Sequence, residues 1–243
     1  MQKYPITAVS GFWPVNNKHN NAFDNWLPKT LKINCPYVMY SHEEDQEMLR
    51  RCRGDLPTVF VKRTIPEFVT YKHADAIQTH PRHVPSKELQ MIWNEKLFLL
   101  RETARTNPFN SEWFVWLDAG LFLYRDQMPP LEQFNVERLA TLPKDKLIFS
   151  SSDSPTFCPE ATREGNYYHY VSGIFMIHKD GLEAFVSMFE KYMDTFLSKK
   201  DWIYTDQVIL THMYKDHPEM FHWIIHDYGR LVLWLFEKPI LVQ

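Results

Sequence analysis

Short apolar segments alternate with longer amphipathic ones along the first quarter of the chain. Apolar runs at 6–9, 37–40 and 58–61 are separated by segments of helical character at 19–31 and 43–53. Apolar runs of this length that alternate with helical patterns are typical of strands in a parallel sheet. The sequence therefore predicts a β-α-β-α-β start to the fold, with the first strand ending at Ser10-Gly11.

The second of these helices has the clearest end signals in the chain. It opens with Glu43-Glu44-Asp45, closes with Arg50-Arg51-Cys52-Arg53 and is followed by Gly54. Acidic side chains stabilise the positive end of a helix, basic ones the negative end, and glycine suits the residue that follows the last turn.

The apolar run 113–117 lies in the middle of the chain and is followed directly by Asp118, Ala119 and Gly120. A run that is apolar throughout, without alternation, predicts a strand buried on both faces of a sheet. Ligands of open α/β sheets bind beyond the carboxyl ends of the strands. We therefore expect Asp118 to contact a metal, a ribose hydroxyl or an acceptor, and the alternative is an Asp that only starts a turn.

Residues 86–105 predict a helix whose apolar stripe contains one lysine. Lys96 takes the place of an apolar residue in a row with helical spacing, which consists of Leu89, Ile92, Trp93, Leu99 and Leu100. A lysine is almost never fully buried without a partner. Either its stem extends past the core to solvent, or its ammonium meets an anion at the ligand-binding edge. In both cases we expect Lys96→Met to keep or raise the stability of the fold.

The second half of the chain continues the alternation. We expect strands at 147–149, 170–177 and 223–226, a helix at 180–197 and another that starts near Thr205. Polar residues that stand at the ends or breaks of these elements are candidates for chemistry, namely Asp153, Ser172, Gly173, Asp206, Gln207 and His226.

The stretch 66–85 has no clear period and contains His80-Pro81-Arg82-His83. This cluster could hold a metal, but it has no nearby carboxylate, so a mobile surface loop is the favoured interpretation. Irregular segments of this length often act as lids over a site.

Composition narrows the class of protein. The chain has 243 residues, 44% of them hydrophobic, a net charge of −3 and three cysteines. The absence of a basic excess argues against nucleic acid as a partner. The three cysteines fit neither a disulfide framework nor a metal-ligand spacing, which favours a reducing compartment. The start lacks a signal-peptide pattern, and the longest apolar run, 231–236, is too short for a transmembrane segment. We expect a soluble cytoplasmic protein, and attachment to a membrane surface stays open.

Three segments together carry a resemblance to a known family. Trp93-Asn94 with Lys96, then Asn107-Pro108-Phe109, then Trp116 with Asp118-Ala119-Gly120 resemble motifs of the HtrL/YibB family. That family is similar to GT-A glycosyltransferases and is tied to surface polysaccharide assembly. The resemblance implies an α/β, GT-A-like (Rossmann-related) fold, with a mostly parallel mixed sheet flanked by helices. It also implies one domain over 1–243, with a nucleotide-binding half at 1–120 and an acceptor half at 121–243.

The resemblance also implies partners and residue roles. The donor would be a nucleotide sugar, with a UDP-sugar favoured, and the acceptor a glycan, glycolipid or glycoprotein hydroxyl. Donor-binding positions would be Thr7, Ala8, Val9, Ser10, Lys96, Asp118, Ala119, Gly120, Ser172 and Gly173. Catalytic positions would be Asp206, Gln207 and Asp153, and Mn²⁺ or Mg²⁺ would bind at Asp118 and His226. The chain departs from the GT-A pattern at Gly120, because the second Asp of the Asp-x-Asp motif is missing there.

Three functions remain as hypotheses. The leading one is a nucleotide-sugar-dependent glycosyltransferase. A phosphatase of the haloacid-dehalogenase type is disfavoured, because such enzymes need a second Asp two residues after the first and place the motif on an early strand. The third is a degenerate GT-A fold that binds glycan or protein without turnover, and the glycine at position 120 is its main support.

Overall fold

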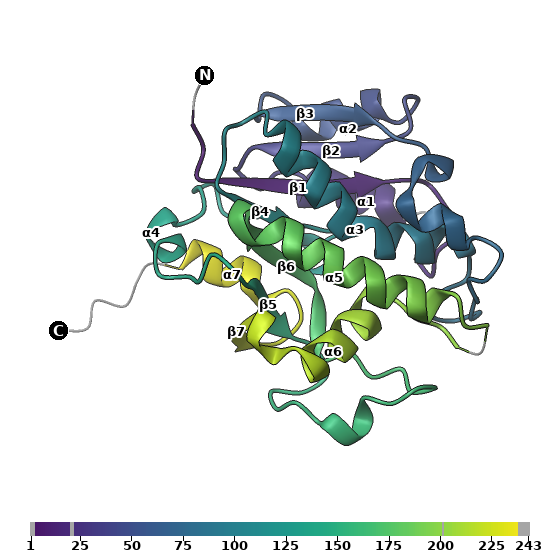
Figure 1. Cartoon of the computed structure of the whole chain (residues 1–243). Helices are drawn as coiled ribbons and strands as arrows, with labels where there is room; N and C mark the ends of the chain where they lie inside the picture. Colours follow the sequence, from purple (N-terminus) through teal and green to yellow (C-terminus); the bar gives the residue numbers. More distant parts are fainter. Residues whose placement is uncertain (1–2, 20–21, 201, 238–243) are drawn as a thin grey trace.

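A seven-stranded mixed sheet forms the centre of the molecule (Figure 1). The computed structural model describes residues 3–19, 22–200 and 202–237. The strands are β1 (Ile6–Phe12), β2 (Tyr37–Ser41), β3 (Thr58–Lys62), β4 (Trp113–Trp116), β5 (Leu147–Ser151), β6 (Val171–His178) and β7 (Phe221–His226). The helices are α1 (Phe23–Thr30), α2 (Gln46–Arg53), α3 (Lys87–Thr106), α4 (Val136–Leu139), α5 (Lys179–Leu197), α6 (Asp206–Asp216) and α7 (Arg230–Phe236).

The strand order is β3-β2-β1-β4-β6-β5-β7, and β6 alone runs against its neighbours. The other strands are parallel to one another, so their carboxyl ends meet at a single edge of the sheet. This arrangement confirms the predicted α/β class with a mostly parallel mixed sheet. It also places the end of β4, where Asp118 follows, at the edge where ligands bind in such folds.

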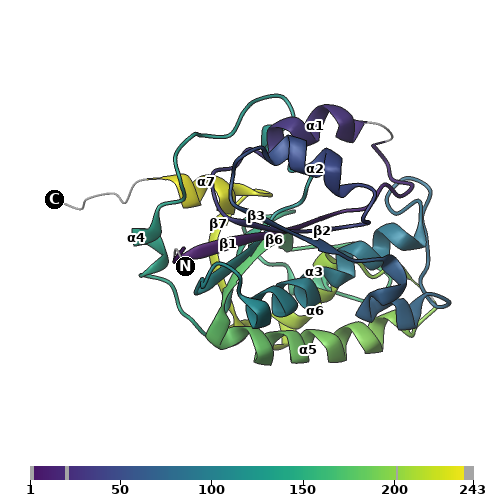
Figure 2. The ribbon, with the colours of Figure 1, turned by 90° about the horizontal axis from the view of Figure 1, so that it is seen from above.

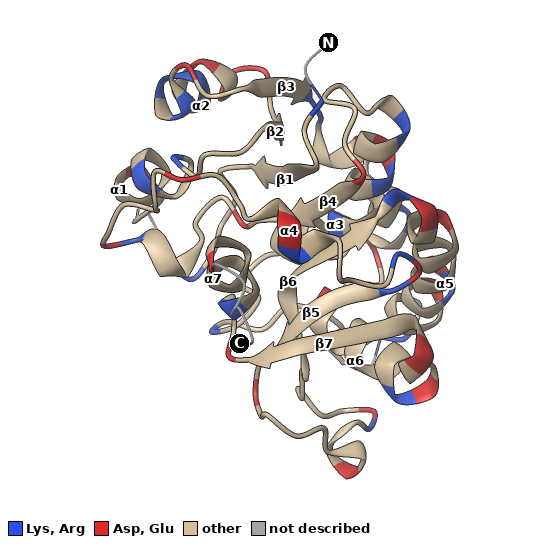
Figure 3. Ribbon diagram, turned by 90° about the vertical axis from the view of Figure 1, so that its left-hand side faces the viewer, with Lys and Arg blue, Asp and Glu red and all other residues tan. Residues whose placement is uncertain are grey.

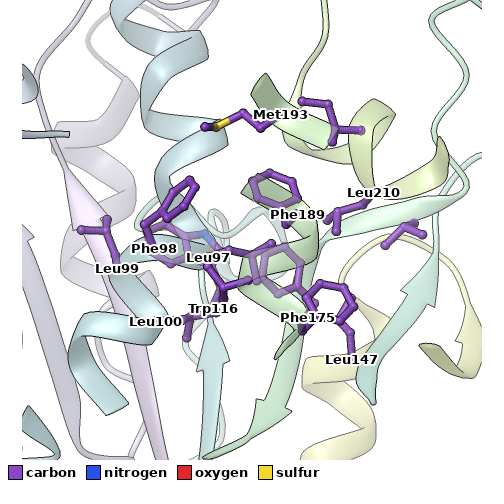
Figure 4. Packing of buried hydrophobic residues seen from close by; sticks show 14 of the residues in the cluster. Leu97, Phe98, Leu99, Leu100, Trp116, Leu147, Phe175, Phe189, Met193 and Leu210 are labelled. Carbon is purple, nitrogen blue, oxygen red and sulfur yellow. The ribbon is translucent and has the colours of Figure 1, made fainter. Parts of the chain in front are cut away.

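Helices cover both faces of the sheet (Figure 2). Helices α3, α5 and α6 lie on one face, and α1, α2 and α7 lie on the other. Strand β4 supplies both apolar layers, because Phe114 and Trp116 pack into the first and Trp113 and Val115 into the second. Figure 4 shows Trp116 within the first layer, near Leu97 of α3. The prediction of a strand buried on both faces is confirmed.

Several boundaries differ from those predicted. Strand β1 does not end at Ser10-Gly11 but runs on to Phe12, because Gly11 pairs with Tyr40 of β2. Helix α2 begins at Gln46, after the acidic residues expected to open it, although Gly54 ends it with a φ of 61° as expected. Helix α1 begins at Phe23, and residues 20–21 of the predicted helix lie outside the described residues.

The stretch 66–85 is more ordered than the sequence suggested. It includes most of the 3₁₀ helix Ile65–Glu67 and a second one, Val69–His73. The buried Glu95 carboxylate of α3 fixes the second, since its Oε1 accepts from the Val69 amide at 2.9 Å. Its Oε2 accepts from the Thr70 amide at 3.0 Å. The stretch is therefore anchored to α3 at its beginning.

Charged residues lie mainly on the helices and loops (Figure 3). The strands of the sheet are mostly uncharged, in keeping with burial on both faces. In the part of the chain that the structure describes, every helix is too short or too polar to cross a membrane.

Candidate functional site

Asp118 lies directly beyond the carboxyl end of β4, and both of its carboxylate oxygens are engaged. Oδ1 accepts a hydrogen bond from the Trp116 indole Nε1 at 2.8 Å, and Oδ2 accepts from the Tyr228 hydroxyl at 3.1 Å. Trp116 holds the carboxylate from within β4, whereas Tyr228 reaches it from the loop after β7. The side chain is 32% exposed, so it is fixed in orientation and still open to a ligand.

Lys96 projects from α3 toward this carboxylate. Its Nζ lies 3.2 Å from Asp118 Oδ1 and 3.0 Å from Asp206 Oδ2, and it donates to the Gly173 carbonyl at 3.1 Å. The residue is only 3% exposed, so its stem does not extend to solvent. Burial by itself lowers the pKa of Lys96, but the two carboxylates outweigh this effect and leave the pKa above its ordinary value. Lys96 is therefore a charged ammonium held between two carboxyl groups.

Asp206 is the first residue of α6 and is almost completely buried. Burial raises its pKa, and the Lys96 ammonium and the backbone amide of Gln207 reduce that effect. The position at a helix N-terminus also favours a negative charge. Thr205 precedes the helix, but its side chain makes no capping hydrogen bond. Two carboxyl groups and one ammonium thus form a cluster, Asp118–Lys96–Asp206.

Gly173 of β6 lies against this cluster. A Cβ atom at this position would come within 3.0 Å of Lys96 Nζ, 3.2 Å of the Tyr228 hydroxyl and 3.3 Å of Gln207 Oε1. A side chain here would have to displace one of these groups. Gly173, which the sequence singled out as a break in a strand, therefore permits α3, α6 and the loop after β7 to converge at this point.

The cluster forms the floor of a cleft with a volume of about 510 Å³. The cleft is lined by the segment after β1, by α1, α3 and the N-terminus of α6, and by the loops after β4, before β6 and after β7. The volume is in the range of small-molecule sites. It is large enough for a nucleotide with an attached sugar.

A comparison with known protein families identifies the family to which this chain belongs. Residues 61–232 match the family described as "Bacterial protein of unknown function (HtrL_YibB)". The chain belongs to the HtrL_YibB family. No curated protein sequence matches it.

Solved structures similar to this HtrL_YibB chain include a glycosyltransferase. The apo form of mouse xyloside xylosyltransferase 1 matches with a TM-score of 0.51 and 12% sequence identity, covering 91% of this chain and 85% of that one. A weaker match, with a TM-score of 0.41 and 9% identity, is 4-diphosphocytidyl-2C-methyl-D-erythritol synthase from Anaerococcus prevotii DSM 20548. It covers 93% of this chain and 90% of that one. The first match shows a GT-A-like fold.

The cleft of the HtrL_YibB chain contains some of the residues that the sequence suggested. Those that line it are Lys96, Asp118, Ala119, Gly120, Asp206 and Gln207. Gly173 lies against the floor, and the buried Ser172 hydroxyl instead donates to the Ile174 carbonyl at 2.9 Å. The structure therefore brings together residues from both halves of the chain, and their individual roles remain predictions.

The residues of β1 expected to border the donor lie deeper than the cleft. Thr7, Ala8, Val9 and Ser10 are all completely buried, and the Thr7 hydroxyl bonds to Ser111 at 2.7 Å. Gly11, Phe12 and Trp13 line the cleft in their place. The offset arises because β1 is longer than its apolar run, so the strand reaches the ligand edge only at its last residues.

Asp153 lies behind the cleft wall. Its Oδ1 is 2.8 Å from the His169 Nδ1, and its Oδ2 accepts from the His169 amide at 3.0 Å. Burial lowers the pKa of His169, but Asp153 outweighs it and raises the pKa above the ordinary value. His169 lines the cleft, so Asp153 contacts the site through this imidazole.

His226 is not brought to Asp118. Strands β6 and β5 separate β4 from β7, and three strand spacings correspond to roughly 14 Å, too far for one ion to bridge. The His226 Nδ1 lies 3.0 Å from the Ser151 hydroxyl instead. Both residues end strands at the same edge, as expected, but the strand order keeps them apart.

Over the residues that the structure describes, the other candidates do not complete a site that the protein alone could offer to Mn²⁺ or Mg²⁺. Among the described residues, no group of three or more His, Cys, Asp or Glu side chains could hold a metal ion, and this includes the histidines of 80–83. Lys96 Nζ lies between the Asp118 and Asp206 carboxylates, where a cation would bind. The structure therefore does not fit the metal role expected for Asp118.

Sequence reasoning missed several residues that line the cleft. They are Lys18, His19, Arg125, Tyr167, His169 and Tyr228, whereas His83 belongs to the histidine cluster that the sequence had singled out. Tyr228 follows the strand that ends at His226, so its position after a strand was an available signal. The others come from irregular segments, whose side chains only the tertiary structure can place.

Proposed function

We propose that this protein is a glycosyltransferase that transfers a sugar from a nucleotide-sugar donor to an acceptor hydroxyl. The observation that carries this proposal is the Asp118–Lys96–Asp206 cluster on the floor of a cleft of about 510 Å³. The GT-A-like fold supports it, since ligands of α/β sheets bind at this edge. A UDP-sugar is the favoured donor, and a hydroxyl of a glycan, glycolipid or glycoprotein is the acceptor.

The reaction would form a bond from the acceptor oxygen to the anomeric carbon and break the bond from that carbon to the diphosphate. The acceptor proton has to pass to a base as the new bond forms. His169 faces the cleft and is oriented by Asp153 through the contact at 2.8 Å. We assign it the proton-accepting role and assign Asp153 the positioning role.

The Asp118–Lys96–Asp206 cluster would orient the donor. The carboxylate oxygens of Asp118 are partly exposed and can accept hydrogen bonds from ribose or sugar hydroxyls. Gln207, whose Oε1 lies near the position of Gly173, can bond a further sugar hydroxyl. Lys96 holds both carboxyl groups in place through its contacts at 3.2 and 3.0 Å, so it acts on the donor through them.

Donor binding tests the proposal directly. UDP-sugars and GDP-sugars should raise the melting temperature, by an amount that corresponds to about 2.7 kcal/mol at a hundredfold excess over Kd. Asp118→Asn should weaken binding by about 10-fold or more, because hydrogen bonds to a charged group contribute roughly 1.5–3 kcal/mol. Asp55→Asn, at an exposed position after α2, is the matched control.

The same preparations separate the alternatives. Transfer of the sugar to water or to an added glycan, followed by mass spectrometry, supports an enzyme. Tight binding of donor without any turnover would instead favour the glycan- or protein-binding module that Gly120 suggested. A lack of binding to every nucleotide sugar would sink both. Parallel titrations with Mn²⁺ and with EDTA test the predicted dependence on Mn²⁺ or Mg²⁺.

A further inference from the structure

The cleft has a cationic side, remote in sequence from Lys96. Lys18 and His19 lie in the segment after β1, and Arg125 lies in the segment after β4. All three line the cleft. Within the described residues, neither Lys18 nor Arg125 forms a salt bridge with a carboxylate, although the charge of Asp118 acts on Arg125 from a greater distance. Burial lowers the pKa of His19 to about 4, and the positive charges of Arg125 and Lys18 contribute to this.

Gly120 lies beside this cationic side, and the space around it is closed. A Cβ atom at this position would come within 2.7 Å of the Phe23 ring and 3.2 Å of the Trp26 ring, both from α1. The Arg125 guanidinium lies 3.7 Å above the Trp26 ring, and its Nε donates to the Gly120 carbonyl at 2.9 Å. Where a second metal-binding Asp would stand, this chain therefore has an aromatic wall that carries a cation.

Lys96 cannot neutralise a bound diphosphate by itself. Its ammonium is already paired with two carboxyl groups, which offset its attraction for an incoming anion. A diphosphate in this cleft is therefore expected at the cationic side, near Lys18 and Arg125, and away from the floor. Positioned cations are one of the general ways to stabilise the charge on a departing phosphate.

We propose that Lys18 and Arg125 bind the diphosphate of a nucleoside diphosphate directly, with His19 as a further hydrogen-bonding group and without a divalent cation. This inference rests on the proposed function, because it places the diphosphate of the same donor. The two positive charges then neutralise the diphosphate in place of a bound metal. The Trp26 ring orients the guanidinium, and the contact to Gly120 fixes its distance from the strand end.

Calorimetric titration with UDP, GDP and inorganic pyrophosphate in EDTA tests the inference. We expect the Kd in EDTA to stay within about threefold of the Kd with Mn²⁺. Such a difference means that the metal contributes less than about 1 kcal/mol to the free energy of binding. Arg125→Met should weaken binding of UDP and pyrophosphate by about 10- to 100-fold, as expected for loss of a charge-assisted contact. Lys18→Met should weaken it less, because its side chain is exposed. Both losses should shrink at high salt.

Matched variants keep the test interpretable. Arg51→Met removes the same charge from the exposed face of α2 and should leave diphosphate binding unchanged. Arg125→Lys keeps a positive charge and should recover part of the affinity, which a purely structural role of Arg125 would not explain. Melting temperatures of all variants identify any that fail to fold.

The outcomes distinguish this inference from the proposed function. Binding that disappears in EDTA and returns with Mn²⁺ overturns the inference, whether or not the protein transfers sugar. Unchanged affinity in a folded Arg125→Met variant overturns it as well. Metal-free binding that depends on Arg125, without turnover of any nucleotide sugar, upholds the inference and overturns the proposed function.

Discussion

At the residue scale, the site depends on one buried lysine that the helical pattern had marked as an anomaly. The sequence left open whether Lys96 reaches solvent or meets an anion. The structure places it between Asp118 and Asp206, at 3.2 and 3.0 Å. This pairing reverses the expectation that its removal is harmless, since the loss of one partner leaves buried charge uncompensated.

Lys96→Met is therefore expected to lower the free energy of unfolding by about 3–5 kcal/mol at neutral pH. The loss should shrink as the pH falls, because burial raises the pKa of Asp206 and its protonation removes the unpaired charge. Urea unfolding of the variant, of Asp206→Asn and of the double variant measures the coupling. The double variant should lose clearly less than the sum of the two. Additive losses would show that the two side chains do not interact.

At the scale of elements, two buried polar side chains fix the positions of segments around the site. Glu95 of α3 holds the 3₁₀ helix Val69–His73 through the Val69 and Thr70 amides. Arg53 at the end of α2 binds the carbonyls that precede β2 and β3. Neither residue stood out in the sequence as more than a member of a helix, because their partners lie in other segments.

Glu95 should make the stability depend on pH. Burial raises its pKa to about 7 from the ordinary 4.5, despite hydrogen bonds from Thr70 and Val69 that lower it. Between pH 4.5 and 7, the folded state therefore holds a proton on Glu95 that the unfolded state has already released. The contribution is fully present below pH 4.5 and is lost as the pH rises through 7. Between pH 5 and 8 this corresponds to roughly 2–3 kcal/mol.

Glu95→Gln should remove this dependence, because the amide does not titrate. Denaturant unfolding at several pH values measures it, and Glu88→Gln, at an exposed position in the first turn of α3, is the control. A variant with the same pH profile as the natural chain would contradict the assignment.

Arg53→Met should destabilise the fold by about 3–5 kcal/mol, because several buried carbonyls lose their donor at once. The guanidinium donates to the carbonyls of Leu31, Ile33, Cys35 and Pro57. Arg51→Met, two residues earlier on the exposed face, should change stability by less than about 0.5 kcal/mol. Thermal unfolding compares the two. Equal effects would mean that the buried network contributes little.

At the scale of the whole molecule, the two halves of the chain are interleaved. Strand β6 comes from the second half and pairs with β4 of the first, and both apolar layers contain residues from each half. The cleft is shared in the same way, with Asp118 from one half and Asp206 from the other. The division into a nucleotide-binding half, 1–120, and an acceptor half, 121–243, remains a prediction about roles.

A fragment of residues 1–120 should not fold alone. It contains β1 to β4 but leaves one edge of β4 unpaired and much of both apolar layers exposed. Circular dichroism during heating should show no cooperative transition for the fragment and a clear one for the full chain. A cooperative transition in the fragment would show that the first half is a domain in its own right.

Local sequence patterns predict the class of fold and several of the residues that line the cleft. Apolar runs and helical spacing are local, so they predict the strands around Asp118 and the helix that carries Lys96, and family motifs cover the same region. Asp118, Lys96, Asp206 and Gln207 are all candidates from the sequence, and all four line one cleft.

The arrangement of these residues depends on contacts between distant elements. Strand order separates His226 from Asp118, and the length of β1 moves the cleft from Thr7 to Gly11 and its neighbours. Only packing reveals that Lys96 is shared by two carboxylates and that Arg125 lies on Trp26. Local patterns fix which face a side chain takes within its own element. Contacts between distant elements depend on the order and offset of the strands, and no short stretch of sequence encodes these.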